Sequence, residues 1–230
     1  MCYTATQISK VNKLKDVYQT PIIIPEDIEK QVPLFKADGF AHPNLWVLIN
    51  EGLQQMQWGL IPNWNKPYAD MLKMSNNTLN ARSETIRDLV TFKNSIINKR
   101  CIIPLDGFFE YKQVEGKKLP YFIYPNNNQL FNVGGIFSNY KNPINQEWIT
   151  TFSIITEPAN EFMSSIHNTA KRMPLILKSD MIKDWINPNS PASLIDDLLR
   201  YTSDDSLFSA HQVKSDLKKA PNNESVIAPI

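Results

Sequence analysis

The sequence predicts a single α+β domain built around a curved, largely antiparallel, barrel-like sheet with peripheral helices. Two observations favour this fold class. Short runs of β-branched and aromatic residues dominate the middle of the chain, and the helical segments between them do not follow a strict strand–helix alternation. The 230 residues, 42% hydrophobic and 20% charged, are enough to bury one large core, although length alone does not exclude two small domains.

Six segments are predicted to be strands. Each is a short run rich in Val, Ile, Phe, Tyr or Thr, the residue types that fit a pleated and half-buried surface. In chain order they are LWVLIN (45–50), RCIIPL (100–105), GFFEY (107–111), PYFIY (120–124), LFNVGGIF (130–137) and TTFSIIT (150–156).

Four segments are predicted to be helices. In SETIRDLVTFKNSIINK (83–99), apolar residues recur at helical spacing behind Ser83, a candidate N-cap; they are Ile86, Leu89, Val90 and Ile97. The other three are PANEFMSSI (158–166), SDMIKDWI (179–186) and SPASLIDDLL (190–199).

The two ends of the chain differ from its middle. The last segment, DLKKAPNNESVIAPI, is polar and contains proline, so we expect a domain over residues 1–215 and a flexible tail over 216–230. The first thirty residues contain lysines and no apolar run, and no stretch approaches the roughly 18 apolar residues of a membrane span. We therefore expect a cytoplasmic monomer with no membrane contact.

The composition limits the kinds of binding site that the protein can contain. Two cysteines and three histidines are too few and too scattered for the usual zinc clusters, so we expect no metal and no cofactor. Seven glycines and no phosphate-cradling loop argue against nucleotide folds built on glycine fingerprints. The net charge of +1 gives no global case for nucleic acid, so DNA binding would need a local basic patch.

Cysteine is the second residue of the chain. An initiator methionine is generally trimmed when the next residue is small, and Cys2 would then carry a thiol and a free α-amine together. The alternative is that Cys2 is simply part of a frayed terminus.

Three polar residues lie in segments that are otherwise strand-like or that join a strand to the predicted helix. Glu110 stands among aromatic residues in GFFEY, where it either faces solvent or is buried with a partner, because isolated burial of a charge is costly. If it is buried, its pKa rises towards the range useful for proton transfer. Asn80 and Arg82 precede Ser83; Asn80 is either a cap or an amide that orients a reacting group, while Arg82 holds an anion.

Two further segments have either an ordinary structural role or a role in binding DNA. His167 is followed by Lys171 and Arg172, which suits phosphate contact, although a lone histidine is more often a surface or satisfied residue. Trp58 and Trp64 bracket the turn in WGLIPNW; they are core or lid residues, or else a platform on which an unpaired base stacks.

Taken together and in this order, Cys2, WGLIPNW, NARSET, PLDGFFEY and H…RMPLIL resemble the SRAP family (SOS response-associated peptidase), the HMCES/YedK-like abasic site processing proteins. The resemblance runs from residue 2 to about residue 177. It implies the SRAP fold and a protein of the DNA damage response that senses abasic sites in single-stranded DNA, captures them covalently through Cys2 and so shields the lesion.

The resemblance also implies roles for individual residues. Cys2 is the nucleophile, Asn80 a positioning amide, Glu110 the acid/base carboxylate and His167 an assisting histidine. Implied DNA contacts are phosphate binding by Arg82, Arg172 and Lys171 and base stacking by Trp58 or Trp64. Reference pKa values of roughly 8 for an α-amine and 8.5 for a thiol leave both groups of Cys2 partly reactive near neutral pH.

Two departures from the family pattern concern the DNA contacts. The family often begins Cys-Gly-Arg, whereas Thr4 stands here at the arginine position, and the inserted NTAK separates His167 from Arg172. Tyr3 is available instead to stack on a base. Two other functions stay open: an N-terminal-nucleophile hydrolase or peptidase, which would include removal of its own Met1, and a single-stranded DNA binding module with no catalysis.

Overall fold

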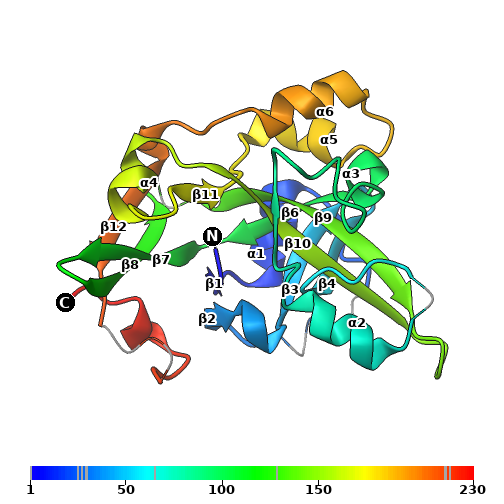
Figure 1. Ribbon diagram of the computed structural model, residues 1–230, viewed down its shortest axis with the longest axis horizontal. Coiled ribbons are helices and arrows are strands. Elements are labelled where there is room, and N and C mark those ends of the chain that lie inside the picture. The colour runs from blue at the N-terminus through cyan, green and yellow to red at the C-terminus, as the bar shows by residue number, and fades with distance from the viewer. Residues whose placement is uncertain are drawn as a thin grey trace.

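The computed structural model describes residues 2–24, 26, 28, 31–64, 66–127, 129–214, 217 and 219–230. Its strands, in chain order, are β1 (Thr4–Gln7), β2 (Leu34–Asp38), β3 (Asn44–Ile49), β4 (Gly52–Trp58), β5 (Asn80–Arg82), β6 (Arg100–Leu105), β7 (Gly107–Val114), β8 (Lys117–Pro125), β9 (Phe131–Lys141), β10 (Trp148–Pro158), β11 (Arg172–Pro174) and β12 (Phe208–Gln212). They form two sheets, a smaller one that contains the N-terminal strand β1 and a larger one built around β9 and β10 (Figure 1).

The larger sheet closes into a barrel. Its strands follow the order β10–β4–β3–β6–β9, and β9 pairs again with β10 to complete the circle. Among the described strands of this barrel only the β4–β10 pair is parallel. Strands β5 and β11 extend the sheet by pairing with β10 at its C-terminal half. The barrel-like, largely antiparallel α+β fold predicted from the sequence is confirmed.

The smaller sheet has the order β12–β8–β7–β1–β2. Strand β1 lies inside it, next to the edge strand, paired antiparallel with β7 through Thr4 and Phe109 and with β2 through Thr4 and Asp38. This position fixes the start of the chain. Cys2 therefore emerges beside β7, one of the strands predicted from the sequence.

The helices lie around the two sheets (Figure 1). They are α1 (Val11–Tyr18), α2 (Tyr68–Ser75), α3 (Ser95–Asn98), α4 (Glu161–Ile166), α5 (Ile182–Ile186) and α6 (Ala192–Leu199), with 3-10 turns η2 (Gly39–Ala41), η3 (Ser179–Met181), η4 (Asp205–Leu207) and η5 (Glu224–Val226). No helix in the described part of the chain is long and apolar enough to cross a membrane.

The helix predicted over 83–99 is wrong for most of its length. Residues 83–94 form successive turns, and only α3, over Ser95–Asn98, is helical. Ile86 is buried, but Leu89, Val90 and Ile97 are 47%, 56% and 60% exposed. The predicted apolar stripe is thus divided between the core and the surface, and the segment is rich in Thr, Asp and Asn, which compete with helix formation.

The segment predicted to be a loose tail packs on the smaller sheet where it is described. Leu217 and Val226 are buried in one cluster with Phe109 of β7. The Lys36 ammonium donates hydrogen bonds of 2.7 Å to the carbonyls of Leu217 and Ala220. The predicted boundary at residues 215 and 216 itself lies outside the described residues.

Candidate active site around Cys2

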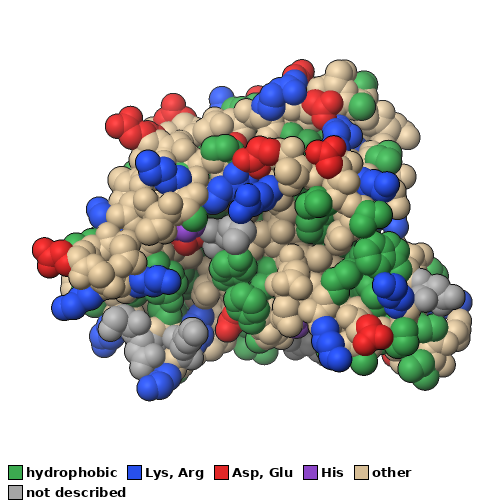
Figure 2. Space-filling model, viewed as in Figure 1, with side chains coloured by type: hydrophobic (Ala, Val, Ile, Leu, Met, Phe, Trp, Pro, Cys, Tyr) green, Lys and Arg blue, Asp and Glu red, His purple; other side chains and the backbone are tan. Residues whose placement is uncertain are grey.

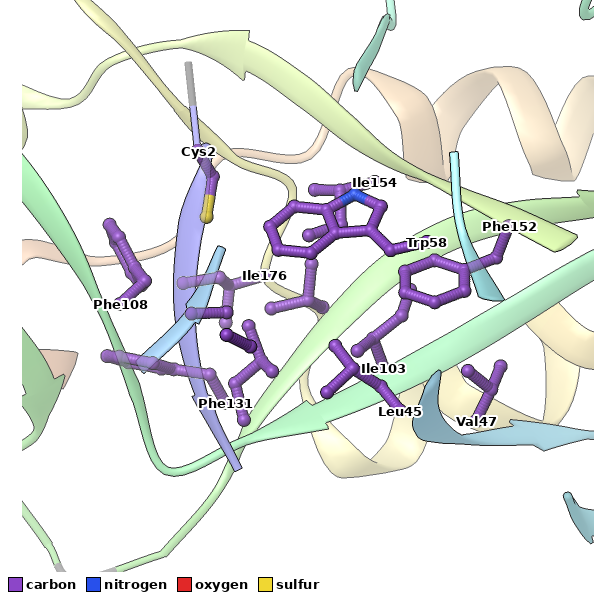
Figure 3. Close-up of a cluster of buried hydrophobic side chains, with 14 of the residues drawn as sticks. Cys2, Leu45, Val47, Trp58, Ile103, Phe108, Phe131, Phe152, Ile154 and Ile176 are labelled. Carbon is purple, nitrogen blue, oxygen red and sulfur yellow. The ribbon is translucent and has the colours of Figure 1, made fainter. Parts of the chain in front are cut away.

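The Cys2 side chain points inward. It is 0% exposed and belongs to the core cluster of the barrel. Figure 3 shows its sulfur directed into this cluster, with Phe108 on one side and Trp58 on the other. Burial, and secondarily the nearby charge of Glu110, raises the pKa of the Cys2 thiol far above its usual value. The thiol is therefore not partly ionised at neutral pH in this conformation, contrary to the expectation from reference values.

Asn80 holds the backbone of Cys2. Strand β5 pairs in parallel with β10, and Asn80 lies opposite Ile154. Its Nδ2 donates a 2.9 Å hydrogen bond to the Cys2 carbonyl oxygen. Among the described residues none donates to the buried Asn80 Oδ1, so this oxygen can still accept a hydrogen bond from an amine or hydroxyl. Residues 83–94 form turns rather than a helix, so Asn80 does not act as a helix cap.

Glu110 lies on β7, one residue beyond the Phe109 that pairs with Thr4. It is 4% exposed, so the solvent-facing interpretation is wrong. Burial raises the pKa of the Glu110 carboxyl above its usual value, and the charge of His167 is among the influences that oppose the shift. A buried carboxyl with a raised pKa can hold a proton near neutral pH and give it up in a reaction.

His167 follows the last residue of α4, whose N-cap Asn160 accepts a hydrogen bond from the Met163 amide. His167 is 8% exposed, and its Nδ1 lies 3.8 Å from Glu110 Oε1. The same Nδ1 lies 2.8 Å from the Arg172 carbonyl oxygen and 3.4 Å from the Arg172 amide nitrogen. Because a carbonyl oxygen only accepts, we assign the proton to Nδ1, which leaves Nε2 as the acceptor nitrogen.

The inserted NTAK forms a tight loop that closes on His167. The Lys171 amide donates a 2.9 Å hydrogen bond to the His167 carbonyl, with Lys171 in the left-handed region at φ 47°. The Asn168 side chain exchanges two 2.9 Å hydrogen bonds with the backbone of Gln113 on β7. The insertion therefore keeps Arg172 next to His167.

The cations predicted to hold phosphates differ in their exposure. Arg82 and Lys171 are exposed, and the charge of Arg82 acts on the phenol of Tyr3, whose pKa is raised chiefly by burial. Arg172 is 8% exposed, and its guanidinium pairs through both terminal nitrogens with Glu84. Lys and Arg side chains gather over β11 on the face shown in Figure 2. A phosphate reaching Arg172 would have to displace Glu84.

The two tryptophans of WGLIPNW also differ. Trp58 is 0% exposed, donates from Nε1 to the Leu79 carbonyl at 2.9 Å and stacks on Phe152. It belongs to the same buried cluster as Cys2 and presents no face to a base. Trp64 is half-buried, with the Lys66 ammonium 5.5 Å from its ring centroid. Of the two, only Trp64 is placed to stack on an incoming base.

Two carboxylates beside this site were not predicted from the sequence. Glu84 and Glu157 lie beside Arg172, and Glu157 is 2% exposed at the end of β10. Glu84 stands inside the NARSET motif, a signal that could have drawn attention to it; Glu157 carries no local signal. Among the described residues, no group of three His, Cys, Asp or Glu side chains could hold a metal ion.

Comparison with known proteins gives consistent matches. A family model described as SOS response associated peptidase (SRAP) matches residues 1–220. The abasic site processing protein YoaM of Bacillus subtilis is 40% identical over 79% of this chain and 78% of its own length. YoqW, a second protein of that description from the same organism, is 36% identical over 87% of this chain and 92% of its own length. A crystal structure of a protein from Bacteroides thetaiotaomicron superposes with a TM-score of 0.93 at 30% identity, covering 100% of both chains.

Proposed function

The chain belongs to the SOS response associated peptidase (SRAP) family, and we propose that it captures abasic sites in single-stranded DNA through a covalent bond from Cys2. One observation carries the proposal: residues from three separate parts of the chain form one connected group with Cys2, in which Asn80 donates to the Cys2 carbonyl, the charge of Glu110 acts on the Cys2 thiol, and His167 lies 3.8 Å from Glu110. The relatives named abasic site processing proteins support the choice of substrate.

The reaction requires a free amine on Cys2. Hydrolysis of the Met1–Cys2 peptide bond supplies it; Met1 itself lies outside the described residues. The amine attacks C1′ of the ring-opened abasic sugar, and loss of one water gives an imine. The sulfur then adds to the same carbon, its proton passes to the nitrogen, and a five-membered thiazolidine closes. The net reaction joins one aldehyde to one cysteine with release of one water.

Each neighbouring residue has a distinct task in this proposal. Protonated Glu110 donates to the sugar ring oxygen as the C1′–O4′ bond breaks, and the C1′ hydroxyl releases its proton to water. The Glu110 carboxylate then accepts a proton from the attacking amine and passes it to the hydroxyl that leaves as water. Asn80 holds the Cys2 backbone and offers Oδ1 to the amine. His167 presents Nε2 to a sugar hydroxyl or to water. Because ring closure is intramolecular, it gains the advantage of an oriented unimolecular step.

The burial of the sulfur separates this proposal from hydrolysis of peptides. An N-terminal-nucleophile hydrolase needs its thiol to attack the substrate first, and the Cys2 thiol is enclosed in the core with a raised pKa. In abasic-site capture the amine attacks first and the thiol reacts only afterwards. The observed geometry thus favours capture over peptidase activity on other chains.

The test is incubation of the protein lacking Met1 with an oligonucleotide that carries one abasic site, followed by denaturing electrophoresis. We expect a DNA-linked band, no band with a tetrahydrofuran analogue that has no aldehyde, and no heat-stable band with Cys2→Ala. Cys101→Ala is the matched control, because Cys101 is also a fully buried thiol. A normal band from Cys2→Ala would overturn the proposal, and peptide turnover without a band would favour the hydrolase.

A further inference from the structure

A second group of aromatic and basic side chains lies at the far end of the barrel from Cys2. Trp64, Lys141 and Trp148, with Asn63, Pro143 and Gln146, line a cavity of about 370 Å³. Figure 2 shows hydrophobic and basic side chains gathered over α2 and the adjoining ends of β9 and β10, on the same face as the basic side chains over β11.

Both indoles at this cavity are paired with lysines. The Lys66 ammonium lies 5.5 Å from the Trp64 ring centroid, and that of Lys141 lies 5.8 Å from the Trp148 ring centroid. Trp148 is 62% exposed, although burial of such a ring is normally favourable. An exposed ring with a cation beside it offers both the stacking surface and the charge that an unpaired nucleotide needs.

The loop that carries this surface is held in a defined shape. Between β9 and β10, the Asn142 side chain accepts a 3.0 Å hydrogen bond from the Ile144 amide, and the Gln146 amide donates at 2.9 Å to the Asn142 carbonyl. Trp64 in turn packs against the buried cluster of Ile61, Met71 and Tyr140. The backbone that leads into Trp148 and the ring of Trp64 are therefore ordered before a ligand arrives, which reduces the entropy lost on binding.

Strand β10 connects this surface to the Cys2 site. Trp148 begins β10, and Ile154, six residues further on, pairs with Asn80. At about 3.4 Å per residue the separation is about 20 Å along the strand. A single strand held at Cys2 has only to extend over a few nucleotides to reach Trp148.

We propose that Trp64, Trp148, Lys66 and Lys141 form a second binding surface for the undamaged single strand on one side of the abasic site. The bases stack on the indoles without sequence preference, and the lysines contact the phosphates; the exposed Glu147 is the one carboxylate beside Trp148 in the described loop. The inference rests on the proposed function for its ligand, single-stranded DNA.

The test uses two oligonucleotides with an abasic site at one end and an undamaged tail of about 12 nucleotides, on the 5′ side in one and on the 3′ side in the other. A strand that follows β10 has one polarity. Trp148→Ala should therefore weaken binding to one of the two by roughly 5- to 100-fold and slow its cross-linking at low protein concentration, leaving the other unchanged. Trp148→Phe should restore most of the loss.

Ile144→Ala is the matched control, because Ile144 is 81% exposed in the same loop and does not line the cavity. Equal behaviour of Trp148→Ala and wild type towards both oligonucleotides would overturn the surface, as would an equal loss on both. Fluorescence anisotropy with an undamaged oligonucleotide keeps the two proposals distinguishable. A wild-type protein that binds this DNA through Trp148 but never forms a covalent band refutes abasic-site capture and leaves the surface intact.

Discussion

Glu157→Gln should make the stability of the protein less sensitive to alkaline pH. Glu157 is 2% exposed, and its Oε2 accepts a 3.1 Å hydrogen bond from Thr202 Oγ1. Among the described residues none donates to its Oε1. Burial raises the pKa of the Glu157 carboxyl from its usual 4.5 to about 8, with the Thr202 hydrogen bond and the charge of Arg172 opposing the rise. The side chain is thus protonated in the folded protein at neutral pH.

The direction of the pH effect on stability depends on whether the folded or the unfolded chain holds the proton of Glu157 more tightly. Below about pH 4 the carboxyl is neutral in both the folded and the unfolded chain. As the pH rises from about 4.5 to 8, the unfolded chain releases this proton while the folded chain retains it, so the free energy of unfolding falls. At 1.36 kcal/mol per pKa unit, the full effect is about 5 kcal/mol, of which about 4 kcal/mol lies between pH 5 and pH 9. Glutamine keeps the acceptor for Thr202 and cannot ionise.

The assay is urea denaturation at pH 5 and pH 9, followed by fluorescence of the buried tryptophans. Relative to wild type, Glu157→Gln should gain about 2–4 kcal/mol on going from pH 5 to pH 9. Glu51→Gln, at an exposed carboxylate, is the control and should follow the wild-type profile. Parallel profiles for wild type and Glu157→Gln would mean that Arg172 holds Glu157 ionised in the folded protein, and the reasoning would fail.

Three further predictions concern the reaction and the chain ends. Glu110→Gln should slow cross-linking, measured on timed gels, by roughly 10²–10⁴-fold. Its affinity for undamaged single strands, measured by anisotropy, should change little. A cross-linking rate within about twofold of wild type would show that Glu110 does not transfer the proton. An extension ahead of Cys2 turns its amine into an amide, so cross-linking should vanish by gel, whereas a tag after Ile230, which is 71% exposed, should leave it unchanged. Linkage by the extended protein would point to another nucleophile. Deletion of residues 217–230 should lower the melting temperature by several degrees, because it uncovers Phe109, Phe122 and Val213; an unchanged melting temperature would show that this packing contributes little.

The central strands could be predicted because their sequence pattern and their burial agree. RCIIPL and TTFSIIT, for example, correspond to β6 and β10, which lie in the closed barrel where most side chains are buried. The short strands β5 and β11 could not be predicted, because three residues carry no periodicity and pair only once β10 is present. The helix predicted over residues 83–94 is wrong for a different reason. The segment has regular apolar spacing, but turns are enough to place Ile86 in the core.

The site residues could be selected from sequence by their chemical type, but their environment could not. Nothing local distinguishes Trp58, which is fully buried, from Trp64, which is half-buried. The pairing of Arg172 with Glu84 joins residues 88 positions apart, and that of Arg172 with Thr156 depends on the β10–β11 ladder. Such contacts form only in the folded barrel. The sequence alone therefore predicts that Arg172 binds phosphate, but it does not show that Glu84 already pairs with this side chain.

The burial of Cys2 also bears on the order of events in the proposed reaction. A thiol that pointed into solvent beside a cationic group would be partly ionised and would attack an aldehyde directly. Here the sulfur lies between Phe108 and Trp58, and burial raises the pKa of the thiol, so little thiolate is present to attack an aldehyde directly (Figure 3). In the proposed reaction the amine therefore reacts first, and the imine carbon that it creates is then tethered next to the sulfur. A protonated thiol need not ionise beforehand in that arrangement, because the imine nitrogen can receive its proton as the carbon–sulfur bond forms. Enclosing the sulfur thus protects it from other electrophiles and oxidants without preventing ring closure.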